Sequence, residues 1–114
     1  MYRQGYGVAK DDVEASRWYR KSAEQGYAVS QFFLGYIYEF GGDGVDKNYA
    51  EAVYWYRKSA EQGYTDGQYF LGRMYQNGYD VSQDDATAIY WYRKAAQQGH
   101  ESAQKSLNTL GKTW

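Results

Sequence analysis

Small and aromatic residues recur at helical spacing in three stretches of the chain. In the middle stretch these residues stand at positions i, i+3, i+4, i+7 and i+8, which lie on one face of an α-helix. They are Ala52, Trp55, Tyr56, Ser59 and Ala60. Two further helices with the same pattern are centred on Trp18 and Trp91. Large rings alternate with small side chains on each face, so a second helix approaches closely at the small positions. Glycines that tolerate the left-handed cap conformation follow each helix, at Gly26, Gly63 and Gly99.

These stripes belong to one phrase that the chain repeats. It reads WYRKSAEQGY from Trp18, the same ten letters from Trp55, and WYRKAAQQGH from Trp91. The separation is 37 residues between the first two tryptophans and 36 between the last two. A fixed period of this length indicates a stacked array of repeats. The predicted fold class is all-α, an α/α solenoid of antiparallel helix pairs, with Trp55 buried between its own helix A and the next repeat.

The period predicts a single domain over residues 1–114 that contains two full repeats. Each full repeat holds a helix A, a glycine loop and a helix B. In the first one we expect helix A over residues 28–40 and helix B over residues 49–62. The parts of the domain are a partial repeat, two full repeats and a C-terminal capping helix, over residues 1–27, 28–64, 65–100 and 101–114.

Acidic and amide side chains precede the helix B stretches at one repeat position. Asp11, Asn48 and Asp84 are predicted N-caps, since such side chains accept hydrogen bonds from free backbone N–H groups. Capping boxes would be closed three residues later by Glu14, Glu51 and Thr87. The pairs Asp11–Asp12 and Asp84–Asp85 also resemble a two-carboxylate hydrolase site. Their shared position at helix starts favours capping.

Composition excludes several other classes of function. The net charge is −1, which argues against nucleic-acid binding. The chain also has no run of eighteen apolar residues, the length that would predict a membrane-spanning helix. Without cysteine there is no thiolate metal site, and a lone histidine, His100, makes neither a metal site nor a catalytic base with a recognisable nucleophile. The glycine loops lack a phosphate-binding motif. We therefore expect no catalysis and no cofactor. Aromatic residues make up 20% of the chain and supply the core.

The phrase also carries three basic pairs. A stripe for an acidic partner would be formed by Arg20–Lys21, Arg57–Lys58 and Arg93–Lys94. Glu24 and Glu61 stand four residues after Arg20 and Arg57, so local pairing offsets much of this charge. An ordinary solvated face is the favoured interpretation.

In the first full repeat, Leu34, Gly35 and Tyr38 form a narrow packing stripe on helix A. The same helix has a second apolar face outside this stripe. A helix that is apolar on two sides is either buried twice or presents one side to a partner. We predict a partner-binding groove with Phe40 and Arg73 exposed on one continuous surface. For Phe32 and Tyr69 the alternative is packing between neighbouring repeats. The predicted groove residues are Val29, Phe33, Tyr36, Phe40, Asp66, Tyr69, Arg73 and Asn77.

The LG pair of helix A, its following tyrosine, the glycine loop ending in GV and the WYRKAAxQG phrase resemble the Sel-one-like repeat family, a relative of the tetratricopeptide repeat. The resemblance implies a right-handed superhelix in which helix A lines a concave face. It also implies an interaction scaffold that is usually bacterial, in the cytoplasm, the periplasm or outside the cell. Asp80 departs from the family's loop glycine, and the loop near Asp43 is one residue longer.

Two functions from different classes follow. The first is a non-enzymatic scaffold that binds a protein or peptide in the groove, and the alternative is carbohydrate or peptidoglycan binding through the groove aromatics.

Self-association is a further expectation. Met1 and Tyr2 align with the end of a helix A, so helix B of the partial repeat would lack part of its cover. We expect a second copy to contact Tyr2, Trp18 and Tyr19, as a consequence of truncation.

Overall fold

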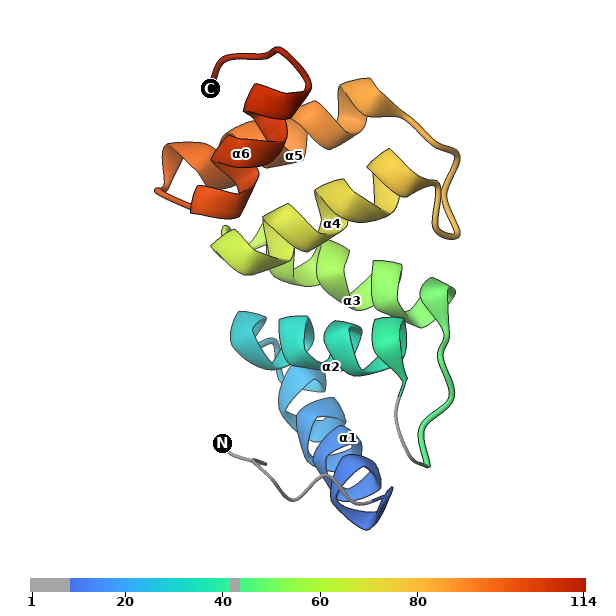
Figure 1. Cartoon of the computed structure of the whole chain (residues 1–114). Helices are drawn as coiled ribbons and strands as arrows, with labels where there is room; N and C mark the ends of the chain where they lie inside the picture. The colour runs from blue at the N-terminus through green and yellow to red at the C-terminus, as the bar shows by residue number, and fades with distance from the viewer. Residues whose placement is uncertain (1–8, 42–43) are drawn as a thin grey trace.

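The computed structural model describes residues 9–41 and 44–114, with side chains from residue 14 onward. Within these ranges the secondary structure consists of helices, which follow one another in order along the stack (Figure 1). They are α1 Ala9–Glu24, α2 Ala28–Phe40, α3 Tyr49–Glu61, α4 Thr65–Asn77, α5 Asp85–Gln97 and α6 Glu101–Thr109. The prediction of helix A over residues 28–40 is confirmed by α2, and α3 ends one residue before its predicted end.

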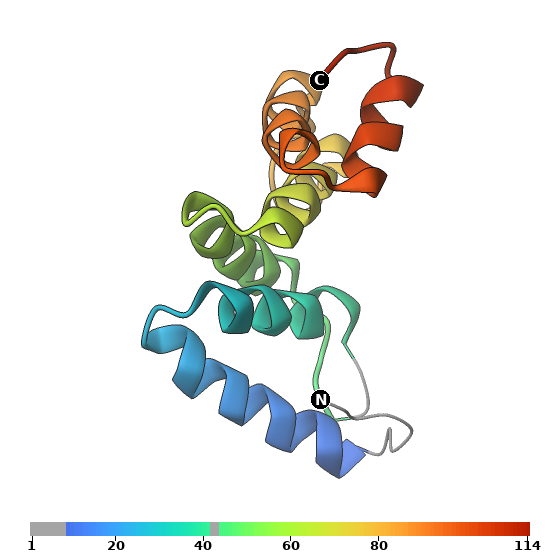
Figure 2. The ribbon, with the colours of Figure 1, turned by 90° about the vertical axis from the view of Figure 1, so that its left-hand side faces the viewer.

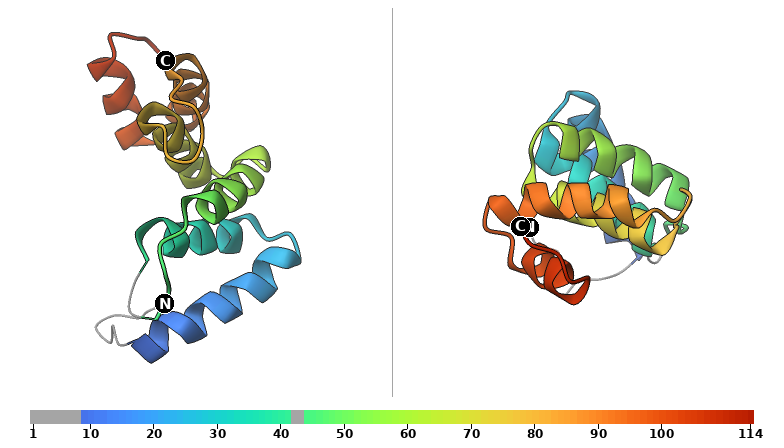
Figure 3. Two further views of the ribbon diagram at one scale, coloured as in Figure 1. Left: turned by 90° about the vertical axis from the view of Figure 1, so that its right-hand side faces the viewer. Right: turned by 90° about the horizontal axis from the view of Figure 1, so that it is seen from above.

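Each helix packs chiefly on the helix before it and the helix after it in the chain. The result is an elongated stack with principal extents of 43 × 26 × 24 Å, in which α1 and α6 lie at opposite ends (Figure 3). Figure 2 shows α4 and α6 on one side of α3 and α5, so the two helix types occupy different sides of the stack. A smaller contact also joins α2 to α4, two successive helix A elements. This arrangement is the predicted α/α solenoid.

Helix starts follow the predicted capping chemistry, with one exception. Asn48 Oδ1 accepts a hydrogen bond from Glu51 N at 3.1 Å, and Asp84 Oδ1 accepts one from Thr87 N at 3.2 Å. The Thr87 hydroxyl also donates to Asp84, and these hydrogen bonds lower the pKa of that carboxyl. The prediction for Asp11 is wrong, because α1 already begins at Ala9. Alanine and lysine favour the helix, so Ala9 and Lys10 extend it past the predicted start.

The glycines of the LG pairs are required by the tyrosines of the repeated phrase. Tyr56 and Tyr92 are fully buried, and their rings lie against the backbone of Gly35 and Gly72. A Cβ at Gly35 would lie 2.7 Å from Tyr56 Cδ1, and one at Gly72 would lie 2.7 Å from Tyr92 Cε1. Helix A and helix B of each full repeat therefore approach closely only because this position carries no side chain.

The tryptophans of the phrase show which neighbour each repeat contacts. Trp55 is 5% exposed and clusters with Leu34 on α2 and Ala23 on α1. Trp55 is buried as predicted, but it packs towards the preceding helix B rather than towards the next repeat. Trp91 likewise packs against the cluster that contains Ala60 of α3. Trp18, at the first end of the stack, is 65% exposed.

Candidate partner-binding surface

Helix α2 presents a row of aromatic side chains to solvent. Its opposite side is fixed in the core by Leu34 and by the contact of Gly35 with Tyr56, which leaves the second apolar face outside. Phe33, Tyr36 and Phe40 are 37%, 43% and 49% exposed, and Val29 is exposed at the start of the same helix. Phe32 turns inward and is buried between the repeats. The structure therefore places all four predicted groove residues of α2 at the surface.

The exposed rings form one cluster with a ring from the next repeat. The Tyr36 centroid lies 4.7 Å from that of Phe40 and 5.8 Å from that of Phe70 on α4. Phe33 contacts Phe32 at 5.2 Å and stacks on Tyr19 of α1 at 5.4 Å. We call Phe33, Tyr36, Phe40 and Phe70 the aromatic surface. Sequence reasoning missed Phe70, although it stands 37 residues after Phe33 and so holds the equivalent repeat position.

Arg73 differs from its predicted state. Its side chain is only 23% exposed, because Nη1 lies 3.0 Å from Oε2 of Glu39, a carboxylate that is itself 3% exposed. The guanidinium lies over Phe70 at 5.0 Å and over Phe40 at 5.9 Å. Burial opposes its charge, but the hydrogen bond and charge of Glu39 prevail and raise the pKa of Arg73. Arg73 is thus not a free cation but a bridge from α4 to α2 that supports the rings.

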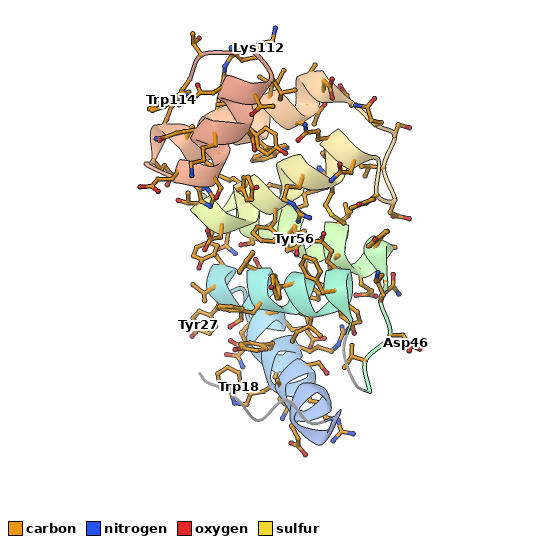
Figure 4. The ribbon with its side chains drawn as sticks, in the orientation of Figure 1. Trp18, Tyr27, Asp46, Tyr56, Lys112 and Trp114 are labelled. Atoms are coloured by element: carbon orange, nitrogen blue, oxygen red, sulfur yellow. The ribbon has the colours of Figure 1, made fainter. Side chains whose placement is uncertain are left out.

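Glu39 also binds the tyrosine of the repeated phrase. The Tyr56 hydroxyl donates to Glu39 Oε1 at 2.7 Å, and burial together with this carboxylate raises the pKa of Tyr56. Figure 4 shows Tyr56 in the middle of the stack, with Trp18 and Trp114 near its two ends. A buried acid therefore joins helices α2, α3 and α4 at the base of the aromatic surface. Nothing in the sequence pattern singled out Glu39.

The other predicted groove residues lie on α4, nearer the C-terminal end. Asp66 Oδ1 lies 2.9 Å from His100 Nε2, and the His100 ring stacks on Tyr69 at 4.7 Å. His100 Nδ1 accepts from Ala103 N and so caps α6, which makes this histidine structural. Tyr69 also packs on Tyr92 at 5.6 Å, whereas Asn77 is exposed at the last residue of α4. Asp66 and Tyr69 therefore hold α4 against α6.

A polar cavity opens between α4 and α6, next to Tyr69. Its volume is about 280 Å³, and each residue that lines it carries a hydroxyl, amide or ammonium group beside apolar carbon surface. The residues are Tyr69, Gln76, Ser102, Lys105, Ser106 and Thr109. Only Tyr69 belongs to the predicted groove set, since the pattern of apolar residues gave no signal for the others. The helix A side of the stack is therefore aromatic at α2 and polar at α6.

The basic pairs divide into two roles. Arg20 and Arg57 donate to the hydroxyls of Tyr38 and Tyr75 at 2.6 Å, so each arginine connects a helix B to the helix A that follows it. Lys58 and Lys94 stay exposed, over the exposed rings of Tyr54 and Tyr90. Arg93 has no such tyrosine and donates to Thr113 O at 2.9 Å. The structure thus shows structural arginines beside solvated lysines.

The described side chains offer no constellation for metal chemistry. Within them, no group of three or more histidine, cysteine, aspartate or glutamate side chains is placed to hold a metal ion. No helix in the same part of the chain is long and apolar enough to cross a membrane.

Comparisons with known proteins agree with this architecture. The family model described as Sel1 repeat matches residues 1–27, 28–64 and 65–100. The chain is 44% identical to c5321, a protective antigen of uropathogenic Escherichia coli with an SLR fold, over 83% of this chain and 20% of that one, with a TM-score of 0.76. A Sel1 repeat protein from Oxalobacter formigenes is 40% identical, over 83% and 39%, with a TM-score of 0.77. No match is found among curated proteins.

The chain spans a fifth of the first solved structure and about two fifths of the second. Both contain repeats of the kind described above, and the family model accounts for the three copies of the phrase. The chain therefore belongs to the Sel1 repeat family, whose members are generally non-catalytic scaffolds for protein interactions.

Proposed function

We propose that this chain is a non-enzymatic scaffold that binds a protein or peptide segment across α2 and α4, on the aromatic surface. The observation that carries the proposal is the exposure of Phe33, Tyr36 and Phe40 on one helix face, where Tyr36 contacts Phe40 directly and the buried Phe32 joins Phe33 to Tyr36. Single exposed apolar residues are common on soluble proteins, but a contiguous group of large rings marks an interaction site.

The rings are held ready for binding by the residues beneath and beside them. Phe70 is partly buried and touches Tyr36, while Arg73 lies over Phe70 and Phe40 and is anchored by Glu39. Fixed rings lose little freedom when a partner docks, so more of the contact energy appears as affinity. Aromatic residues and arginine are also the residue types enriched at the energetic centres of interfaces.

The predicted alternative, carbohydrate binding, fits the ring geometry less well. Tyr36 is inclined to Phe40 by 52° and to Phe70 by 61°. A sugar ring stacks on a flat, open ring face, whereas inclined rings form clefts that accept branched or aromatic side chains. Titration with peptidoglycan fragments, followed by tryptophan fluorescence, separates the two functions.

We also propose that a second copy of the chain packs on the exposed Trp18. The equivalent Trp55 and Trp91 are covered by a preceding helix B, and the same ring at Trp18 is open. An exposed ring beside a regular helix stack attracts another apolar surface. Tyr2 lies outside the described residues, and Tyr19 packs on Phe33, so Trp18 carries this proposal.

The proposed binding site is tested with a displayed library of random peptides selected on the intact chain. Enriched peptides are expected to bind the wild-type chain and to lose binding to Tyr36→Ala/Phe40→Ala. The matched control is Tyr54→Ala/Tyr90→Ala, which removes two exposed tyrosines of helices α3 and α5. Circular dichroism confirms that both variants fold. Peptides that lose binding to the control and keep it with the first variant place the site on the other side of the stack.

A further inference from the structure

We propose that the polar cavity between α4 and α6 receives the carboxylate of an acidic side chain on the bound segment. The inference rests on the proposed function, because it concerns the same ligand farther along the helix A side. The ligand is then a peptide segment with apolar side chains on the aromatic surface and an aspartate or glutamate in the cavity.

The cavity exists because the two positions that hold Glu39 and Arg73 in one repeat carry neutral, shorter or uncharged side chains in the next. Gln76 stands 37 residues after Glu39, and Thr109 stands 36 residues after Arg73. In the earlier repeat, the Arg73 side chain reaches across from α4 and closes the position by pairing with Glu39. In the later repeat the shorter Thr109 lines an open space of about 280 Å³ instead. The molecule thus fills one of two equivalent positions with its own ion pair and leaves the other open.

The groups around the open position favour an anion. The Tyr92 hydroxyl donates to Gln76 Oε1, which fixes the amide and leaves its NH₂ group as the free donor. Hydroxyls of Ser102 and Thr109 add further donors. Lys105 supplies the charge, since within the described residues it takes part in no ion pair. A carboxylate finds amide, hydroxyl and ammonium donors here, whereas a cationic side chain meets Lys105.

Acidic neighbours do not cancel this preference at the cavity. Asp66 stands one turn before the cavity residue Tyr69, and its Oδ1 lies 2.9 Å from His100 Nε2, within hydrogen-bond distance. The buried Glu39 forms an ion pair with Arg73 and accepts a hydrogen bond from the Tyr56 hydroxyl. Glu101 stands four residues before Lys105 on α6, but the described side chains form no ion pair between them, so the ammonium group stays available to a ligand.

The cavity is continuous with the aromatic surface. Tyr69 lines the cavity and contacts Phe70 edge-on at 5.4 Å, and Phe70 in turn contacts Tyr36. Directly packed helix axes lie about 10 Å apart, and successive helix A elements pack less closely than consecutive helices do. The path from α2 through α4 to α6 is therefore about 20 Å or somewhat more. An extended chain covers that distance in about six residues. Apolar and acidic side chains at that spacing would reach both places.

The test uses three acetylated and amidated decapeptides of glycine and serine, with phenylalanine and leucine at positions two and three. Position eight carries glutamate, glutamine or lysine. Binding is followed through the amide NMR spectrum of the full chain. The glutamate peptide is expected to bind about two- to fivefold more tightly than the glutamine peptide, the effect of one partly exposed ion pair. It should also shift the amides of α6, and added salt should reduce the preference.

The variant Lys105→Gln is expected to abolish the preference for glutamate, and the control Lys58→Gln on α3 should retain it. Peptides that shift the α2 amides equally well with glutamate, glutamine or lysine overturn this inference and leave the proposed function standing. A preference that persists in Lys105→Gln also overturns it. If none of the three peptides shifts α2 or α4, the proposed function and this inference both fail.

Discussion

Arg73 on α4 binds the buried carboxylate of Glu39 on α2 across a repeat boundary, with Nη1 3.0 Å from Oε2. In the next repeat the same two positions hold Thr109 and Gln76, so the chain contains its own neutral version of the pair. We expect Arg73→Thr to lower the free energy of unfolding by about 3 kcal/mol, because it leaves a buried carboxylate without its cation.

The double variant Glu39→Gln/Arg73→Thr reproduces the later repeat and is expected to recover most of that loss. Urea denaturation of the two variants and the wild type measures the difference. Equal losses in the single and double variants would show that Arg73 acts through its packing on Phe70 and Phe40 rather than through its charge.

Trp55 and Trp18 occupy one repeat position with opposite burial, which makes them a matched pair. Trp55→Ala is expected to cost about 3–5 kcal/mol, the usual range for a buried large aromatic side chain. Trp18→Ala should cost less than about 1 kcal/mol, because most of its side chain faces solvent. Thermal and urea unfolding give both values. A loss below about 1 kcal/mol for Trp55→Ala would contradict the assigned packing.

Alkaline pH is expected to destabilise the fold through its buried tyrosines. Burial, with the nearby Glu39, raises the pKa of Tyr56, and burial raises the pKa of Tyr92. A phenol whose folded-state pKa lies above its unfolded value of about 10 stabilises the fold below that pH and loses this contribution as the pH rises further. The urea midpoint should therefore fall above pH 10 or so.

The control variants for this pH dependence are Tyr56→Phe and Tyr54→Phe. Tyr56→Phe should lower the stability at neutral pH, since Glu39 loses a donor, and should flatten the fall at high pH. Tyr54 is exposed, so Tyr54→Phe should leave the fall unchanged. A curve that is equally steep for both variants would assign the alkaline loss to other groups.

Self-association through Trp18 predicts a concentration-dependent mass. Light scattering of the chain should show monomer at low concentration and larger species at high concentration, and Trp18→Ala should abolish the increase. Trp114→Ala is the control, because this tryptophan is also exposed but lies at the other end of the stack. A monomer at every concentration would refute the proposal.

The repeated phrase was sufficient to predict the helices and their order. Its period aligned the segments, and the stripe through Trp55 and Tyr56 identified the buried face of helix B. The same stripe did not show which neighbour Trp55 meets, because spacing along one helix defines a face and not the helix that covers it. The exposed Trp18 resolves this, since it is the copy without a preceding helix B in the described part of the chain.

The candidate site was predictable where its residues share one helix. Val29, Phe33, Tyr36 and Phe40 lie on one face of α2 as the spacing indicates, and their role in binding stays a prediction. The pairing of Arg73 with Glu39 joins residues 34 positions apart and depends on how α2 and α4 are rotated against each other. No single-helix pattern contains that rotation, so Arg73 was expected at the surface.

The packing of each helix mainly on its chain neighbours has a consequence for how the molecule folds. Contacts close in sequence form quickly, so we infer rapid folding that begins in any one helix pair and spreads along the array. Unfolding would run in the opposite sense, with α1 and α6 fraying before the centre. The Arg73–Glu39 bridge ties two successive repeats together. It would therefore make the two central repeats melt as a single cooperative unit.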